Sequence, residues 1–260
     1  MNQTTNKKNM GGREMKKTLI ASAIVLCMLV SACGFMASVP WIRSATYNHV
    51  VNLGDSIFAL SGDESTYLHA KAGGKTFRRY ATSGAEIKGG DWIAPSVYNQ
   101  YLTAKSDGPI HTVFMDGGGN DILIPATALD PYNCKKDWWE SSLSTSCKNL
   151  INDVYVETVS TLNLMKSQGV KHLVYQGYYN VKFGLIGSTT LNDAVAYGNT
   201  KLSQAVTNST FPAVDKVYID PRPYITNSDI IIDGIHPTAS GSQKLANLVW
   251  PKLSGWLAND

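Results

Sequence analysis

Short apolar runs alternate with longer segments of mixed polarity along most of the chain. The runs are about four to eight residues long and contain Val, Tyr or Phe, and most end near Gly, Asp or Ser, which is typical of buried strands. The pattern therefore predicts five strands, over residues 49–53, 76–82, 111–115, 170–175 and 215–220.

Between these runs, apolar residues recur every three or four positions, which indicates amphipathic helices. We expect helices over residues 66–72, 95–105, 150–168, 191–206 and 238–257. The spacing is clearest in 150–168, where Gly169 supplies a C-terminal stop. Because helices separate the strands, the sheet should be parallel and covered on both faces. The sequence predicts one α/β domain, and 260 residues are enough for its core.

The start of the chain has the pattern of an export signal. A short basic segment at Met15 precedes an apolar run of 12 residues, 19–30, which is short for a membrane span and suits a signal peptide. The run leads into the tetrapeptide VSAC, which resembles a bacterial lipobox, and this resemblance implies that a lipid is attached to Cys33. Cleavage of an ordinary signal peptide within residues 31–38 and an uncleaved anchor are the alternatives.

These features divide the chain into a signal peptide with an N-terminal extension before Met15 (1–32), a tether (33–46) and one domain (47–260). The expected location is the cell envelope, in the outer membrane if the host is Gram-negative, or the exterior after ordinary secretion. The net charge is +3, but residues 1–32 carry +4, so the rest of the chain is close to neutral. Clustered Lys and Arg on the folded domain, which nucleic-acid binding needs, are therefore not expected.

Export also bears on the four cysteines. Cys27 lies in the apolar run and Cys33 is the lipidation candidate, which leaves Cys134 and Cys147. An even pair in an oxidising compartment favours a disulfide. A metal-binding pair is the alternative, but no His lies within ligand spacing of either residue.

Four polar clusters follow the expected strands or lie in loops, where α/β proteins bind ligands. They are Gly54-Asp55-Ser56, Ser83-Gly84-Ala85, Gly118-Gly119-Asn120-Asp121 and Asp233-Gly234-Ile235-His236-Pro237. A Ser on a strand-to-helix turn exposes its hydroxyl, and its N–H near a helix start can donate to an oxyanion. One loop can place Asp233 beside His236, because the two lie three residues apart. The pattern indicates a Ser nucleophile with a His base.

Together the four motifs resemble those of the SGNH, or GDSL-type, hydrolases. The first motif reads GDSIFALSG from Gly54, and the last reads DGIHP from Asp233. The resemblance covers residues 47–257 and implies a flavodoxin-like three-layer α/β/α sandwich with a central parallel five-stranded sheet. It also implies hydrolysis of carboxylic esters without a metal or an organic cofactor.

The resemblance implies a role for each motif residue. Ser56 is the expected nucleophile, with Asp233 and His236 completing a triad. The expected oxyanion hole combines the backbone N–H groups of Ser56 and Gly84 with the side-chain amide of Asn120. The alternatives are structural: Ser56 as a helix N-cap, and Gly84 and Asn120 as turn residues. Asp220 and Asp229 are rival carboxylates for the His.

The substrate is the least determined part of the prediction. A long insert, residues 122–148, contains Tyr132, Trp138 and Trp139, which we expect near the rim of the site as substrate-binding residues. They suit an acyl chain, a sugar ring or an aromatic alcohol, and packing under the disulfide loop is the alternative. The expected partner is a small-molecule, lipid or sugar ester, and the membrane if Cys33 is lipidated. A carbohydrate O-acetyl esterase is the alternative function, followed by a non-catalytic envelope lipoprotein that binds ligands.

Overall fold

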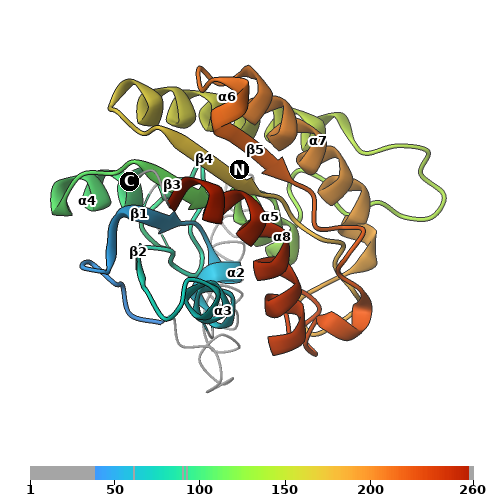
Figure 1. Ribbon diagram of the computed structural model, residues 1–260. Helices are drawn as coiled ribbons and strands as arrows, with labels where there is room; N and C mark the ends of the chain where they lie inside the picture. The colour runs from blue at the N-terminus through green and yellow to red at the C-terminus, as the bar shows by residue number, and fades with distance from the viewer. Residues whose placement is uncertain (1–38, 61, 90, 92, 258–260) are drawn as a thin grey trace, which may run out of the picture. The chain divides into compact units, whose positions relative to one another are not determined.

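The computed structural model describes residues 39–257, with the exception of residues 61, 90 and 92 (Figure 1). The expected signal peptide (1–32), Cys33 and the start of the expected tether lie outside the described residues. Within the described part, no helix is long and apolar enough to cross a membrane.

Five parallel strands form one sheet in the order β2-β1-β3-β4-β5. They are β1 (Tyr47–Leu53), β2 (Phe77–Arg79), β3 (Thr112–Met115), β4 (His172–Gln176) and β5 (Lys216–Ile219). In the middle of the sheet, Val113 of β3 pairs with Val51 of β1 and with Leu173 of β4. Every predicted strand is present, and the expected parallel five-stranded sheet is confirmed.

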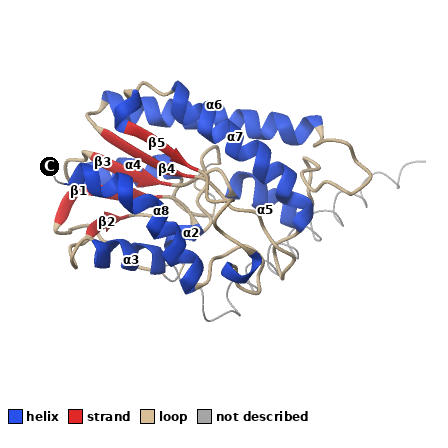
Figure 2. Cartoon of the chain, turned by 45° about the vertical axis from the view of Figure 1, so that its right-hand side comes forward, coloured by secondary structure: helices blue, strands red, loops and turns tan. Residues whose placement is uncertain are grey.

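The helices are α2 (Ser56–Ala59), α3 (Asp63–Lys71), α4 (Val97–Asp107), α5 (Asn120–Ala128), α6 (Thr145–Ser167), α7 (Asn192–Asn208) and α8 (Ala239–Leu257). Helices α2 to α7 lie between the strands in the chain, α8 follows the last strand, and together they cover the sheet on both sides. Figure 2 shows α6 and α7 on one side of the strands and α3 on the other.

Two hydrophobic clusters explain this arrangement, because successive side chains of a strand point to opposite faces. Val51 and Val113 belong to the cluster that holds apolar side chains of α4, α6 and α7. Their neighbours Val50 and Phe114 belong to the cluster that holds side chains of α2, α3 and α8. The sheet is therefore the middle of three layers, and its central strands are apolar on both faces.

The segment after β3 differs from the prediction. The sequence indicates a long insert from residue 122, but Asn120–Ala128 form helix α5, with Pro125 inside it. Proline has no N–H to donate and is uncommon within helices, which is why the local pattern concealed this one. As a consequence, Asn120 is the first residue of a helix that follows the central strand β3.

The last part of the expected tether packs against the domain. The N–H of Val39 donates to the carbonyl of Ala59 at 2.9 Å, and Ile42 forms an antiparallel bridge with Arg79 of β2. The indole N–H of Trp41 donates to the hydroxyl of Thr82 at 3.0 Å. Residues 39–46 therefore extend the domain beyond the expected boundary at residue 47.

Candidate active site

Ser56 is the first residue of α2 and follows the carboxyl end of β1, the strand next to the central strand β3. Asp55 is the N-cap of this short helix, and its Oδ1 accepts a hydrogen bond from the N–H of Ile57 at 3.0 Å. The cap is therefore Asp55 rather than Ser56, which leaves the Ser56 hydroxyl outside the capping interaction. Ser56 is 7% exposed and lines a pocket.

The turn before Ser56 is held by two residues for which sequence analysis suggested no role. Gln100 of α4 brackets Gly54, since its Oε1 accepts from the Gly54 N–H and its Nε2 donates to the Gly54 carbonyl, both at 2.8 Å. Oδ1 of Asp116 accepts from the N–H of Asp55 at 2.7 Å. A Cβ on Gly54, where φ is +139°, would lie 1.8 Å from this Oδ1 atom, so only glycine allows the approach.

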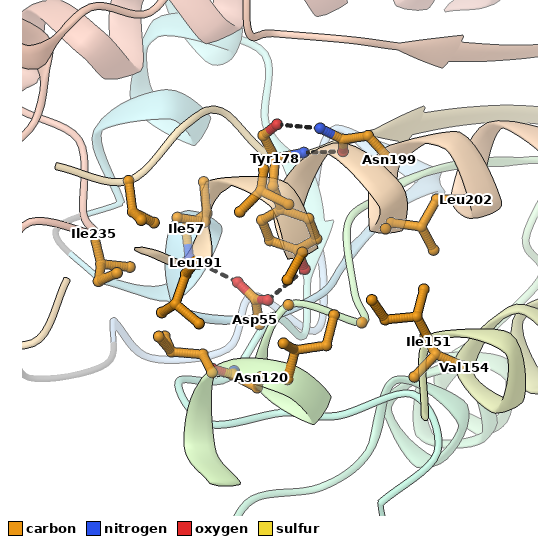
Figure 3. Close-up of a pocket in the computed structure, with 18 of the residues that line it drawn as sticks. Asp55, Ile57, Asn120, Ile151, Val154, Tyr178, Leu191, Asn199, Leu202 and Ile235 are labelled. Carbon is orange, nitrogen blue, oxygen red and sulfur yellow. Dashed lines mark hydrogen bonds between the residues drawn. The ribbon is translucent and has the colours of Figure 1, made fainter. Parts of the chain in front are cut away.

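A buried pair of carboxyl groups supports the same turn. Burial raises the pKa of Asp55, although the Ile57 N–H and the Tyr178 hydroxyl act in the opposite direction. Burial, followed by the charge of Asp55, raises the pKa of Asp116 well above its ordinary value. The hydroxyl of Tyr178 donates to Oδ2 of Asp55 at 2.6 Å, and Figure 3 shows this contact at the pocket. Tyr178 therefore joins the loop after β4 to the residue that precedes Ser56.

Asn120 begins α5 at the carboxyl end of β3, the strand beside β1. Its Nδ2 donates to the carbonyl of Ala85 at 3.0 Å, and this bond orients the amide group. An amide NH₂ carries two N–H groups, so one remains for another acceptor. Asn120 is 6% exposed and lines the same pocket as Ser56.

Gly84 is the residue before Ala85, so the Asn120 bond joins the second and third motifs. Its φ is +83°, which L side chains rarely adopt. The neighbouring backbone is held by Asp121, which accepts hydrogen bonds from the N–H groups of Ile87 and Lys88 at 2.8 and 2.7 Å. Asp121 therefore supports the loop that contains Gly84.

Asp233 and His236 contact each other within one loop. Nδ1 of His236 lies 2.6 Å from Oδ2 of Asp233, while Oδ1 accepts from the N–H groups of Ile235 and His236 at 2.8 and 3.0 Å. Burial alone would raise the pKa of Asp233, but the hydrogen bonds and charge of His236 outweigh it and hold that pKa below its ordinary value. Asp233 is therefore an ionised carboxylate that fixes the orientation of the imidazole.

The opposite ring nitrogen of His236 is available for chemistry. Its Nε2 is buried and has no hydrogen-bond partner within the part of the chain that the structure describes. A buried polar atom without a partner is unfavourable in a structural His and is expected in a base that waits for a proton. No hydrogen bond joins Nε2 to the Ser56 hydroxyl in the described residues, but the loop is close, since Ile235 lines the same pocket as Ser56.

A glycine-rich loop fixes the His236 loop from outside. The N–H groups of Gly187 and Ile186 donate to the carbonyl of Asp233 at 2.8 and 2.9 Å. A Cβ on Gly184 or Gly187 would lie 2.5 Å from backbone atoms of residues 232–234. The two backbones touch directly, which excludes side chains here, and sequence analysis did not identify this contact.

The rival carboxylates have other partners. Asp220 pairs with the guanidinium of Arg222 at 2.5 Å, and Asp229 pairs with Lys244 at 2.7 Å. His236 contacts Asp233 alone among these three candidates.

The expected disulfide is present between Cys134 and Cys147, with the two Cα atoms 5.0 Å apart. The aromatic residues of this region are not in the pocket lining. Trp138 and Trp139 are 91% and 65% exposed and pack on each other, and Tyr132 is 38% exposed. Their expected contact with substrate remains a prediction. The described residues contain no cluster of His, Cys, Asp and Glu that could hold a metal ion.

Solved structures with the same fold share little sequence with this chain. An acetyl esterase variant with an acetate ion has a TM-score of 0.58 at 17% identity, over 81% of this chain and 98% of its own. A variant acetyl-xylooligosaccharide esterase from Geobacillus stearothermophilus has a TM-score of 0.55 at 12% identity, over 82% and 96%. A protein from Slackia heliotrinireducens assigned to the SGNH hydrolases has a TM-score of 0.53 at 15% identity, over 78% and 97%.

A family comparison is more decisive than these likenesses, which show the fold alone. The chain has no significant match among curated proteins. The model of the GDSL-like lipase/acylhydrolase family matches residues 50–249, a range that contains Ser56, Asn120 and the Asp233–His236 loop. With this match over most of its length, the chain belongs to the GDSL-like lipase/acylhydrolase family.

Proposed function

We propose that this ester hydrolase works through an acyl-enzyme on Ser56 and is exported to the cell envelope. The observation that carries the proposal is the His236 imidazole, which is anchored to Asp233 through Nδ1 and has a buried, unpartnered Nε2. In the proposed reaction the Ser56 oxygen attacks the ester carbonyl while Nε2 takes its proton. His236 then protonates the departing alcohol, and a water activated by the same His releases the acid and restores the Ser56 hydroxyl.

The proposed oxyanion hole consists of N–H groups that are held before substrate arrives. The side chain of Asn120 contributes the N–H that does not bond to Ala85. The backbone N–H groups of Ser56 and Gly84 complete the set, and the α2 helix start adds a favourable dipole. Donors fixed in this way cost no reorganisation when negative charge develops on the carbonyl oxygen.

The test compares two buried serines. We expect Ser56→Ala and His236→Ala each to lower kcat for p-nitrophenyl acetate by about 10⁴–10⁶-fold, because the triad acts as a unit. Ser65→Ala is the matched control: Ser65 is 2% exposed in α3 and its hydroxyl has no partner in the described residues, so the activity should persist. A fluorophosphonate should label the wild type at Ser56 and leave the Ser56→Ala variant unmodified. Near wild-type hydrolysis by Ser56→Ala would refute the mechanism.

Export and lipidation rest on the sequence of the first 33 residues. We expect Cys33 to carry a lipid in the native host, because VSAC ends an apolar run of signal-peptide length. Mass spectrometry of the exported protein tests this, with Cys33→Ser as the comparison. An unmodified mature N-terminus beyond Cys33 would indicate ordinary secretion.

A carbohydrate O-acetyl esterase is the second candidate. It is supported by the likeness in fold to an acetyl-xylooligosaccharide esterase, at 12% identity. Hydrolysis of acetylated xylooligosaccharides in preference to simple esters would favour it.

A further inference from the structure

An apolar pocket opens beside Ser56 and Asn120 and continues between α5, α6 and α7. Figure 3 shows aliphatic side chains around it, with Ile151 and Val154 from α6 and Leu202 from α7. Ile57 and Ile235 lie on the side of the proposed nucleophile and base. The pocket is therefore continuous with the place where an ester carbonyl would react.

Away from Ser56 and Asn120, two of the polar side chains that line the pocket, Asp55 and Asn199, already have hydrogen-bond partners. Asp55 accepts from the Tyr178 hydroxyl. The Asn199 side chain donates to the backbone carbonyl of Tyr178 at 2.6 Å and accepts from its N–H at 2.9 Å. A sugar placed against this largely aliphatic lining would lose water from its hydroxyl groups and gain few partners in return, which is unfavourable. A hydrocarbon chain loses no hydrogen bonds and gains from burial.

One wall of the pocket runs along α7. Ala194, Gly198 and Leu202 line the pocket at four-residue intervals, so they lie on one face of α7. Eight residues separate the first from the last, which corresponds to about 12 Å along the helix axis. This length exceeds what an acetyl group needs and suits a chain of several methylenes.

Gly198 has no side chain, which leaves space in this wall for a ligand. It is buried, yet a Cβ added to it would meet only one atom within 4 Å, Cδ1 of Ile122 at 3.8 Å. Buried glycines next to packed side chains meet closer neighbours, such as Gly118, whose Cβ would lie 2.9 Å from Val154. The space above Gly198 is therefore part of the pocket and is not filled by protein.

We propose that this pocket binds the acyl part of the substrate as a straight, medium-length chain such as octanoyl, and that Gly198 keeps it open. The inference rests on the proposed acyl-enzyme at Ser56, because that residue positions the carbonyl at the mouth of the pocket. The alcohol part of the ester then leaves on the solvent side.

The experiment measures kcat/KM for p-nitrophenyl acetate, butanoate, hexanoate and octanoate. Burial of one methylene contributes up to about fourfold, which corresponds to about 0.8 kcal/mol. We expect kcat/KM for the octanoate ester to exceed that for the acetate ester by at least about tenfold, since several methylenes enter the pocket. In Gly198→Leu, the new side chain occupies the pocket, and the octanoate-to-acetate ratio should fall at least about tenfold.

Gly255→Leu is the matched control. Gly255 lies on the exposed side of α8, and a Cβ there meets no atom within 4 Å, so the same substitution in a helix should leave the ratio at its wild-type value. Gly198→Ala adds one methyl group and a residue that favours helix, so it provides a second variant if Gly198→Leu does not fold. We expect it to lower the ratio by a smaller factor than Gly198→Leu.

The outcomes separate the two proposals. Hydrolysis of acetate with a flat chain-length series, or an unchanged ratio in both Gly198 variants, overturns the acyl pocket and leaves the proposed function in place. Faster turnover of acetylated xylooligosaccharides than of octanoate also overturns it. If the wild type hydrolyses none of these esters, the proposed function fails first. A rising series that Gly198→Leu reverses and Gly255→Leu retains supports the pocket.

Discussion

Breaking the disulfide between Cys134 and Cys147 tests how the segment between α5 and α6 is held. The two cysteines are 13 residues apart in the sequence, and closing a loop of this size contributes up to about 3 kcal/mol in the chain-entropy model. Both cysteines are buried, and they pack with Leu143 and Leu150 in an apolar cluster. Trp138 and Trp139 are exposed, so the loop buries little other apolar surface. Reduction should therefore remove a main constraint on the loop and leave it to hydrogen bonds such as those from the N–H groups of Cys134 and Lys135 to Asp130.

The assay is thermal unfolding followed by circular dichroism, with and without a reductant. For a domain of this size, about 1 kcal/mol corresponds to about 2–4 °C in Tm, so complete reduction should lower Tm by about 6–12 °C. The double variant Cys134→Ala with Cys147→Ala should have a Tm equal to or below that of the reduced wild type. It is also the control for the reductant, which should leave the Tm of this variant unchanged.

The same bond should influence substrate selection through the pocket wall. Ile151, Leu191 and Ala194 belong to the cluster around the cysteines and also line the pocket beside Ser56. Loosening this cluster should lower the octanoate-to-acetate ratio of kcat/KM, while the Asp233–His236 contact lies in another loop. Reactive thiols located at Cys134 and Cys147 in the native protein, unfolded without reductant, would refute the bond. An unchanged Tm after complete reduction would refute the reasoning about stability.

Three further predictions concern the site and its supports. Asn120→Ala should lower kcat by about 10²–10³-fold through loss of one oxyanion donor, and a change in KM alone would assign it to substrate binding. Tyr178→Phe removes the hydroxyl that donates to Oδ2 of Asp55, and urea denaturation should show a loss of about 1–3 kcal/mol, because a buried acceptor is left unpaired. Burial raises the pKa of Glu64 from 4.5 to about 8, so the folded protein retains a proton that the unfolded chain releases. The unfolding free energy should therefore fall as the pH rises from about 5 to 8. Glu64→Gln should make this dependence less steep, while Asp55 and Asp116, whose pKa values burial also raises, maintain the remainder. Parallel profiles for variant and wild type would contradict the assignment.

Local sequence patterns predicted much of the fold. Val50 and Val51 are consecutive apolar residues in one strand, and the structure buries them on opposite faces of the sheet. A strand that is buried on both faces must be apolar at successive positions, so the run itself reveals a central strand of a covered sheet. The expected helix boundaries were less exact. Helix α6 was expected to begin at Leu150, but it begins at Thr145, with Ser144 as its N-cap.

The candidate site was predictable where its groups are neighbours in the sequence. Asp233 and His236 lie three residues apart and contact each other through one turn, so their spacing encodes the contact. Ser56 was identifiable because a strand, a glycine and a helix start follow one another there. Such features depend on a few consecutive backbone conformations, which local residue types determine.

Contacts across long sequence separations were decided by the tertiary structure. Tyr178 and Asp55 are 123 positions apart, and Gln100 and Gly54 are 46 apart. No local pattern in the sequence predicts such pairs. A tyrosine or a glutamine looks the same in the sequence whether or not it contacts a distant residue in the fold. The acyl pocket has the same origin: Ile151, Gly198 and Leu202 are ordinary helix residues, and the space between them exists only once α6 and α7 are packed. The sequence by itself therefore determined the layers, the motif order and the Asp233–His236 contact. Tertiary packing decided which residues support Ser56 and what shape the cavity beside it has, because a cavity is formed by surfaces that meet only in the folded chain.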